Sequence, residues 1–276
     1  MSVLKLKLLG QMECGTSTDS LLALSTRKSE MLLAYLALAP GVRHPRERLI
    51  NLLWSDRGEE QARNSLRQSL SSIKKSLEAA CPLLLEVDRT TVRVKPDLIQ
   101  VDALEFEQLA ANEDIDNLAR AAELYQGEFL EGISIRDVAS QEWLSNERER
   151  FKRLIVEVFS SLSHLQISTG QHKVAIESAE RLVVHDPLHE QGWRLLMRAY
   201  HEKGDRNHAL LSYKRCSDIL VKELGIEPEP ETIELRELII SGNIKPDNET
   251  IAPVAAPNEA SQKTAGPATE TSNKDH

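Results

Sequence analysis

The sequence contains no long hydrophobic run. Its longest notable one, MLLAYLALA, has nine residues, whereas a membrane-spanning helix needs about 18 to 20. The first residues, MSVLKLKLLG, alternate apolar and basic side chains and lack the sustained apolar stretch and the small-residue cleavage site of a signal peptide. We therefore expect a cytoplasmic protein without a membrane partner.

Motifs of common enzyme classes are missing as well. No GxxxxGKS or GxxxxGKT phosphate loop and no GxSxG turn with a catalytic serine occur. The cysteines have no CxxC spacing, which predicts reduced, structural thiols; they are Cys14, Cys81 and Cys216. His185 and His189 have the spacing of two metal ligands on a helix, but Pro187 lies between them. We therefore expect no enzyme activity, no cofactor and no metal site.

Negative charge predominates, but it is unevenly divided. The whole chain has a net charge of −9. Residues 1–100 contain 15 Lys and Arg against 11 Asp and Glu, whereas the remaining residues contain 19 against 32. The first part is therefore cationic and the second acidic, which favours an electrostatic footprint for an anionic partner on the N-terminal part alone.

The N-terminal part begins with strand patterns and continues with helical ones. LKLKLL, residues 4–9, alternates apolar and basic residues as a half-buried strand does, and short apolar runs with turn residues follow it. TRKSEMLLAYLALAPG has apolar residues at helical spacing and is stopped by Pro40 and Gly41. Pro45 opens a second helical segment, PRERLINLLWS. Two or three short strands and two helices are predicted.

A third helix and a hairpin complete this pattern. Asp56 followed by Glu59 resembles a capping box at the start of the helix over residues 59–78. LLLEV and TVRVK then alternate on either side of residues 88–90, as the strands of a hairpin do. The order of strands, three helices and a hairpin predicts a winged helix of the response-regulator type, with the third helix in the DNA major groove and the hairpin as the wing.

The polar face of the third helix contains the candidate binding residues. On a helical wheel the apolar residues gather within about 40° of Leu66, and donor-rich residues fall between about 60° and 200°. Contacts with base edges in a DNA groove are predicted for Arg63, Asn64, Arg67, Gln68 and Ser71. Contacts with the DNA backbone are predicted for Lys74, Lys75, Arg89 and Arg93. An ordinary solvated helix face is the alternative.

From VDALEFEQL onward the pattern is helical, and it contains a repeat. Gly170 and Gly204 are 34 residues apart, and so are Ala175 and Ala209. Thirty-four residues is the tetratricopeptide period, about one pair of stacked helices. The large residues of the repeat are predicted to pack between helices. Trp143 is predicted to anchor the core, with a place between the two halves of the chain as the alternative.

Several segments together carry a family resemblance. They are LLAYLALAPG, RERLINLLW, ARNSLRQSLSSIKKSL, YQGEFLEG, ERERFKRL and the long stretch from HDPLHEQGW to ELGIEPEPET. In these segments, over residues 3–240, the chain resembles the antibiotic regulatory proteins of streptomycetes and their relatives, in which a winged helix precedes a bacterial transcriptional activator domain. The resemblance implies sequence-specific DNA binding, often to direct repeats near a promoter, and recruitment of RNA polymerase.

We therefore predict a mainly α-helical protein with a small β component. Its predicted parts are a winged-helix DNA-binding domain at 1–98, a bacterial transcriptional activator domain with tetratricopeptide-like repeats at 99–242, and a disordered tail at 243–276, which has no aromatic residue. The predicted function is transcriptional activation, with duplex promoter DNA, RNA polymerase and a second copy of the chain as partners. The alternative is a protein-interaction scaffold or a sensor fragment that uses its repeats without specific DNA binding.

Overall fold

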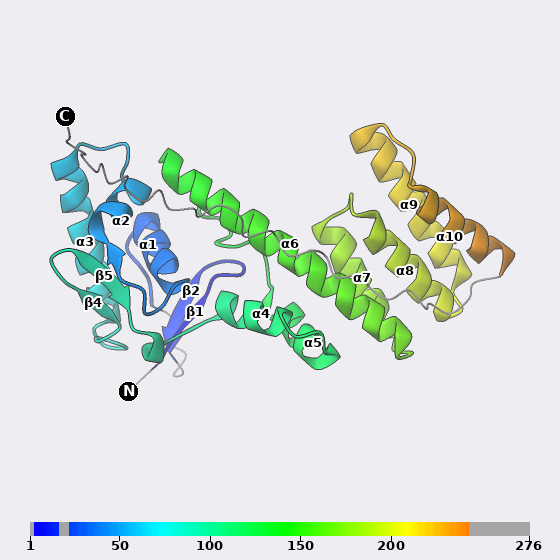
Figure 1. Cartoon of the computed structure of the whole chain (residues 1–276), viewed down its shortest axis with the longest axis horizontal. Helices are drawn as coiled ribbons and strands as arrows, with labels where there is room; N and C mark the ends of the chain where they lie inside the picture. Colours follow the sequence, from blue (N-terminus) through cyan, green and yellow to red (C-terminus); the bar gives the residue numbers. More distant parts are fainter. Residues whose placement is uncertain (1–2, 17–21, 243–276) are drawn as a thin grey trace, which may run out of the picture. The chain divides into compact units, whose positions relative to one another are not determined.

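Short strands open the chain because LKLK places its leucines on one face and its lysines on the other. The computed structural model describes residues 3–16 and 22–242, so the predicted tail at 243–276 lies outside the described residues. Strand β1 (Leu4–Lys7) buries both leucines and pairs antiparallel with β2 (Glu13–Thr16). On its other side β1 pairs parallel with β6 (Ile99–Val101). These strands form a sheet in the order β2-β1-β6 (Figure 1).

Three helices and a second small sheet form the winged helix. Helix α1 (Arg27–Ala37) is capped by Thr26, whose hydroxyl accepts a hydrogen bond from Ser29 N, and its apolar residues are buried. It is followed by α2 (Arg46–Leu53) and α3 (Glu59–Leu77). Strands β3 (His44–Pro45), β4 (Leu85–Val87) and β5 (Thr91–Val94) form a sheet in the order β3-β5-β4 (Figure 1). The predicted winged helix is therefore confirmed.

Three local predictions differ from the structure. The predicted capping box at Asp56 is wrong, because α3 begins after Gly58 and has no side-chain cap. Pro45 is the residue before α2 and also pairs with β5, so it ends a strand that we did not predict. We also predicted no strand from VDALEFEQL onward, whereas β6 ends at Val101. Strands of two or three residues have too few positions to show an alternating pattern.

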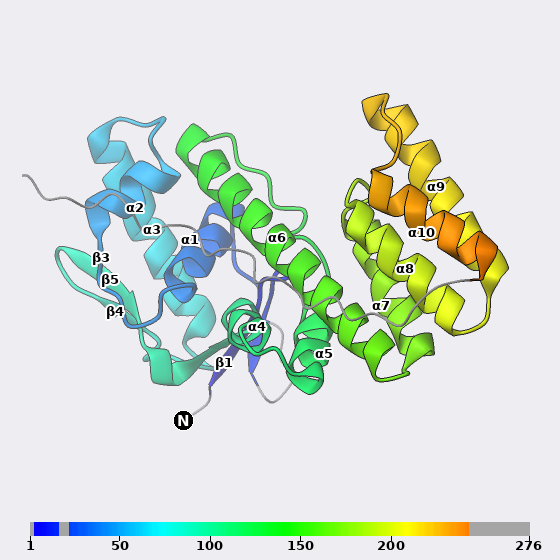
Figure 2. The ribbon, with the colours of Figure 1, turned by 45° about the vertical axis from the view of Figure 1, so that its right-hand side comes forward.

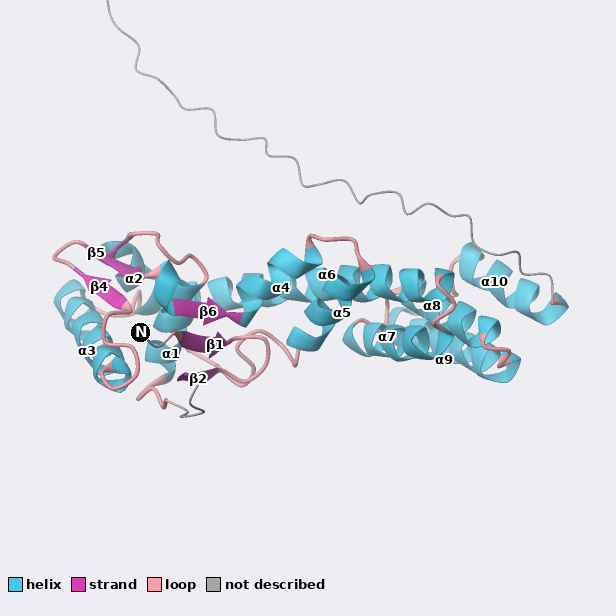
Figure 3. Cartoon of the chain, turned by 90° about the horizontal axis from the view of Figure 1, so that it is seen from below, coloured by secondary structure: helices cyan, strands magenta, loops and turns pink. Residues whose placement is uncertain are grey.

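After β6 the described chain is mainly helical, as predicted, apart from the longer connection at residues 125–137. A 3-10 turn, η1 (Pro96–Leu98), lies just before β6. The helices are α4 (Asp102–Ala110), α5 (Ile115–Leu124), α6 (Val138–Ser168), α7 (His172–His185), α8 (Glu190–Glu202), α9 (Arg206–Leu224) and α10 (Pro230–Ser241). Seen from below, strands occupy only the winged-helix end of the ribbon (Figure 3). Within residues 3–16 and 22–242, none of the helices combines the length and the apolar character that crossing a membrane requires.

The 34-residue repeat corresponds to two helix pairs, α6 with α7 and α8 with α9. Gly170 and Gly204 occupy the turns within these pairs at φ +74° and +84°, a region that favours glycine. Ala175 and Ala209 are fully buried. A Cβ on Gly192 would lie 2.9 Å from the Cγ atom of Leu182, so the small residue that lets α8 approach α7 is found there. The tetratricopeptide-like repeat is therefore confirmed.

The YQGEFLEG segment, residues 125–132, forms backbone hydrogen bonds with the residues that follow β1. Leu130 N donates to Leu8 O at 2.8 Å, and Gly10 N donates to Glu128 O at 3.1 Å. Arg148 of α6 holds the segment from the other side, since its guanidinium donates to Leu130 O at 2.9 Å and to Phe129 O at 3.0 Å. This segment therefore ties β1 to α6.

Aromatic rings continue this connection. Trp143 of α6 contacts Tyr35 of α1 (ring centroids 5.4 Å apart) and Phe129 (5.9 Å), so its ring lies between the winged helix and the YQGEFLEG segment, the alternative that we predicted for it. The same series of ring contacts runs on through Phe151, Phe106, Tyr125 and His185 to Phe159. Figure 2 shows α6 passing from beside α1 and α2 to α7. The winged helix and the following helices belong to one compact unit.

Candidate nucleic-acid interface

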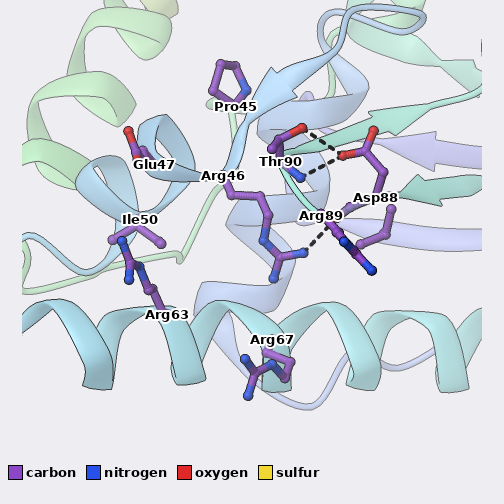
Figure 4. A pocket seen from close by; sticks show the side chains of 10 residues that line it. Pro45, Arg46, Glu47, Ile50, Arg63, Arg67, Asp88, Arg89 and Thr90 are labelled. Atoms are coloured by element: carbon purple, nitrogen blue, oxygen red, sulfur yellow. Dashed lines mark hydrogen bonds between the residues drawn. The ribbon is translucent and has the colours of Figure 1, made fainter.

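A groove of about 810 Å³ lies between α3 and the β4–β5 hairpin (Figure 4). Arg63 and Arg67 line it from α3, Arg46 from the first turn of α2, and Arg89 from the tip of the hairpin. The other lining residues are Pro45, Glu47, Ile50, Val87, Asp88 and Thr90. Four guanidinium groups thus face two carboxylates, a surface that favours an anionic ligand.

The exposed face of α3 has the pattern predicted from the helical wheel. The predicted apolar stripe is buried; it consists of Ala62, Leu66, Leu70, Ile73 and Leu77. The predicted contact residues are all exposed; they are Arg63, Asn64, Arg67, Gln68, Ser71, Lys74 and Lys75. Arg63 pairs with Glu59 at 2.5 Å, and Arg67 Nη1 donates to Asn64 Oδ1 at 3.1 Å. Such exposed pairs on one helix contribute only about 0.3–0.5 kcal/mol, so an external ligand can replace them at small cost.

Asp88 fixes the tip of the hairpin. Its carboxylate accepts hydrogen bonds from the Thr91 hydroxyl at 2.7 Å, from Thr91 N at 2.6 Å and from Thr90 N at 2.8 Å. These hydrogen bonds hold the pKa of Asp88 well below its usual range, and the bond from the Thr91 hydroxyl has the largest effect. Arg43 Nη1 lies 3.3 Å from the same carboxylate. Arg89 is exposed within this ordered turn.

Arg93 has a different environment from the other predicted residues. It lies on β5 directly opposite Glu86 of β4, and its Nε donates to Glu86 Oε2 at 3.0 Å. Its side chain is 28% exposed. The pKa of Glu86 lies below its usual value, chiefly because the Arg93 guanidinium donates a hydrogen bond to its carboxylate. A contact between Arg93 and DNA stays a prediction, and the structure gives this side chain an internal partner.

Sequence reasoning missed two arginines beside the groove. Arg46 N donates to Thr90 O at 2.8 Å and Arg46 Nη1 to Asp88 O at 3.2 Å, so Arg46 joins the start of α2 to the hairpin. Arg43 reaches the same hairpin through Asp88. The signal was the basic cluster VRHPRER, in which we considered only the start of a helix.

A second hollow, of about 370 Å³, borders the opposite edge of α3. It is lined by Ser25, Thr26, Lys28, Ser29, Trp54, Arg57, Ser65, Gln68, Ser69 and Ser72. Gln68 is thus separated from the hairpin groove that contains Arg63 and Arg67. The predicted contact residues of α3 therefore form one continuous exposed face of the helix. A hollow lined by basic side chains borders this face on each side.

His185 and His189 take part in packing. The His185 ring stacks on Phe159 at 5.8 Å and meets Tyr125 edge-on at 5.1 Å. His185 is the last residue of α7 and His189 directly precedes α8, so the two histidines flank the turn between these helices. Burial lowers the pKa of both imidazoles. Across the part of the chain that the structure describes, His, Cys, Asp and Glu side chains form no group of three or more suited to a metal ion.

Comparison with known proteins identifies the family. The model of the bacterial transcriptional activator domain matches residues 99–240. Transcriptional regulatory protein MoaR1 of Mycobacterium tuberculosis is 27% identical over 228 residues, which cover 76% of this chain and 70% of MoaR1. Regulatory protein DnrI of Streptomyces peucetius is 24% identical over 78% of this chain and 84% of its own length. Regulatory protein AfsR of Streptomyces coelicolor is 27% identical over 80% of this chain, but only 23% of AfsR is covered.

A solved structure has the same fold. Mycobacterium tuberculosis EmbR, determined in complex with a low affinity phosphopeptide, superimposes with a TM-score of 0.68 at 21% sequence identity, over 89% of this chain and 67% of EmbR. At this identity the likeness concerns the fold alone. The matched domain spans more than half of the chain, and the predicted resemblance is confirmed. The protein therefore belongs to the family of transcriptional regulators that contain a bacterial transcriptional activator domain, as the antibiotic regulatory proteins of streptomycetes do.

Proposed function

We propose that this transcriptional regulator binds promoter DNA with α3 in the major groove and the β4–β5 hairpin against the neighbouring backbone. The observation that supports the proposal most strongly is the groove in which Arg63 and Arg67 of α3 face Arg46 and Arg89. The major groove of B-DNA is about 12 Å wide and admits an α-helix. A hairpin beside such a helix meets the phosphates that border the groove, where arginine is well suited to bind.

Residue chemistry divides the roles along this surface. Arg63, Asn64, Arg67, Gln68 and Ser71 are proposed to read base edges. Lys74, Lys75, Arg89 and Arg93 are proposed to contact phosphates, and Arg46 joins them as an addition from the structure. Arg93 is expected to contribute least to the attraction for phosphate, because its charge is already paired with that of Glu86.

The acidic helical half is proposed to serve activation. It presents stacked repeats, an architecture whose extended surfaces bind other proteins. RNA polymerase is the proposed partner of this half, and a second copy of the chain on a neighbouring DNA repeat is the proposed partner in promoter binding. Both roles place the protein in the cytoplasm of a bacterium, where promoters and polymerase meet.

Binding to promoter DNA is expected to weaken steeply with salt. About five phosphate contacts would lower the affinity by about 10²- to 10³-fold between about 50 and 200 mM salt, because each contact releases condensed counterions. Fluorescence anisotropy of the full chain with labelled promoter fragments, including the promoter of its own gene, measures this dependence. Failure to bind any of them at about 50 mM salt would rule out the proposed function and favour the interaction scaffold.

Replacing Arg67 or Lys74 by alanine is expected to separate the two roles. Arg67→Ala should cost about 1–3 kcal/mol on the preferred site and little on a site mutated at the base that it reads. Lys74→Ala should weaken matched and mismatched sites alike and reduce the salt slope by about 1. Competition binding with paired oligonucleotides measures both effects. Lys173→Ala, which removes an exposed cation from α7, is the control and should leave the affinity unchanged. Equal behaviour of the first two variants on both sites would contradict the assigned roles.

A further inference from the structure

The turn between α2 and α3, residues 54–58, is held by the first residues of α6. Asp137 precedes α6 and is only 2% exposed. Its Oδ2 atom accepts a hydrogen bond from the Ser55 hydroxyl at 3.0 Å and lies 3.3 Å from the donating Asp56 N. Its Oδ1 atom accepts from Ser140 N at 3.2 Å, which caps α6. One carboxylate therefore serves both the start of α6 and the turn before α3.

Side chains from two helices also bind the last carbonyl groups of α2. The Ser140 hydroxyl of α6, which is fully buried, donates to Leu52 O at 2.7 Å. Lys28 Nζ of α1 donates to Leu53 O at 2.5 Å and lies 3.9 Å from the Asp56 carboxylate. The carbonyl groups at a helix end lack partners within the helix, so these contacts fix where α2 ends.

The Asp137 carboxylate is ionised at this contact. Burial opposes its ionisation, but the hydrogen bonds from Ser140 N, the Ser55 hydroxyl and Asp56 N, together with the charge of Lys28, outweigh burial and lower its pKa. A buried carboxylate with several donors is costly to replace, because each donor would lose its partner. The contact is therefore specific in geometry and in charge.

The start of α3 depends on this turn. Gly58 precedes α3 and supplies no side-chain hydrogen bond to its free N–H groups. A helix without a capping side chain is positioned by the segment that leads into it and by its buried face. Here that segment is tied to Asp137 through two successive residues.

We propose that Asp137 is a positioning residue for α3, through which the activator-domain half sets the affinity of the winged helix for its DNA site. The proposal rests on the proposed function, because α3 is the helix assigned to the major groove. A displacement of α6 at Asp137 moves the start of α3, and with it Arg63 and Asn64 in the first turns. A factor that binds the helical half thereby changes DNA affinity without touching DNA.

Asp137→Asn in the full chain is the decisive variant. An asparagine keeps one oxygen to cap Ser140 N and is as good a capping residue as aspartate. Its amide nitrogen, however, cannot accept the hydrogen bond from Asp56 N. We expect affinity for the preferred site to fall about 10-fold, within the roughly 5- to 150-fold range of coupling between sites. Affinity for random DNA and the salt slope should stay unchanged, because the phosphate contacts remain.

Two further variants act on the same contact from the other side. Ser55→Ala removes the hydroxyl donor and should lower specific affinity in the same way, whereas Ser55→Thr restores a hydroxyl and should return it. Asp114→Asn is the matched control, because Asp114 caps α5 by accepting from Asn117 N at 2.9 Å. It should leave DNA affinity unchanged.

Hydrogen exchange of the free protein separates this proposal from the proposed function. In the DNA-free protein, Asp137→Asn should speed amide exchange over residues 54–62 relative to the wild type, and this effect does not depend on whether the protein can bind DNA. Wild-type protein that binds no DNA, with faster exchange in the variant, would reject the proposed function and keep the positioning role. Unchanged exchange over residues 54–62, or unchanged specific affinity in both Asp137→Asn and Ser55→Ala, would overturn the proposal. If Asp137→Asn does not fold, the two Ser55 variants decide.

Discussion

Ala209→Arg is expected to unfold the repeat helices. Ala209 is fully buried on α9 and packs in a cluster with Met197, Leu235 and Ile239. An arginine at this position overfills the cluster, at a cost of about 1–3 kcal/mol, and buries a charge without a partner, at a cost of about 3–5 kcal/mol. Their sum approaches the whole stability of an ordinary domain, about 5–15 kcal/mol. Thermal unfolding followed by circular dichroism measures the loss.

Asn207→Arg is the control for this variant. It introduces the same side chain on the same helix at an exposed position, so its free energy of unfolding should stay within about 0.5 kcal/mol of the wild type. A normal melting curve for Ala209→Arg would mean that α9 packs with another face toward α8 and α10.

Phe129→Ala is expected to cost about 3–5 kcal/mol of unfolding free energy. Phe129 is fully buried and stacks on Phe151 with ring centroids 5.2 Å apart. It also meets the edge of Trp143. Removing the ring leaves a cavity where β1, the YQGEFLEG segment and α6 join. Urea unfolding measured by circular dichroism gives the change.

The matching surface control is Leu83→Ala. Leu83 is 51% exposed, so its truncation removes little packing and should change the free energy of unfolding by less than about 0.5 kcal/mol. A loss below about 1 kcal/mol for Phe129→Ala would show that the cavity collapses or that the ring contacts add little stability.

The helices could be predicted because their apolar residues follow the helical period. The third helix was predicted at 59–78 and ends at Leu77. Strand β6 could not be predicted in the same way, since its pairing with β1 joins segments from opposite ends of the winged helix. The capping residue of α3 was predicted wrongly, because the Asp56 side chain lies near Lys28 and the Asp56 amide binds Asp137, which is distant in sequence.

The candidate site was predictable where it depends on one helix. Exposure of Arg63 and Arg67 follows from the helical wheel, whereas their grouping with Arg46 requires the fold that brings α2 beside the hairpin. The internal partner of Arg93 depends on the register of two strands, which a single sequence does not specify. Contacts that join distant segments were thus the ones that the sequence left open.

The three tryptophans can serve as intrinsic fluorescence probes of three regions of the molecule. Trp54 follows the last residue of α2, and Lys28 lies over its ring. Trp193 lies in the first turn of α8, where its indole N–H donates to Pro187 O at 2.9 Å. Trp143 lies between Tyr35 and Phe129. Since the sequence contains no other tryptophan, replacing two of the three by phenylalanine leaves a single emitter in the winged helix, at the junction or in the repeats. Emission wavelength and quenching then report separately on each region during unfolding or on addition of a partner.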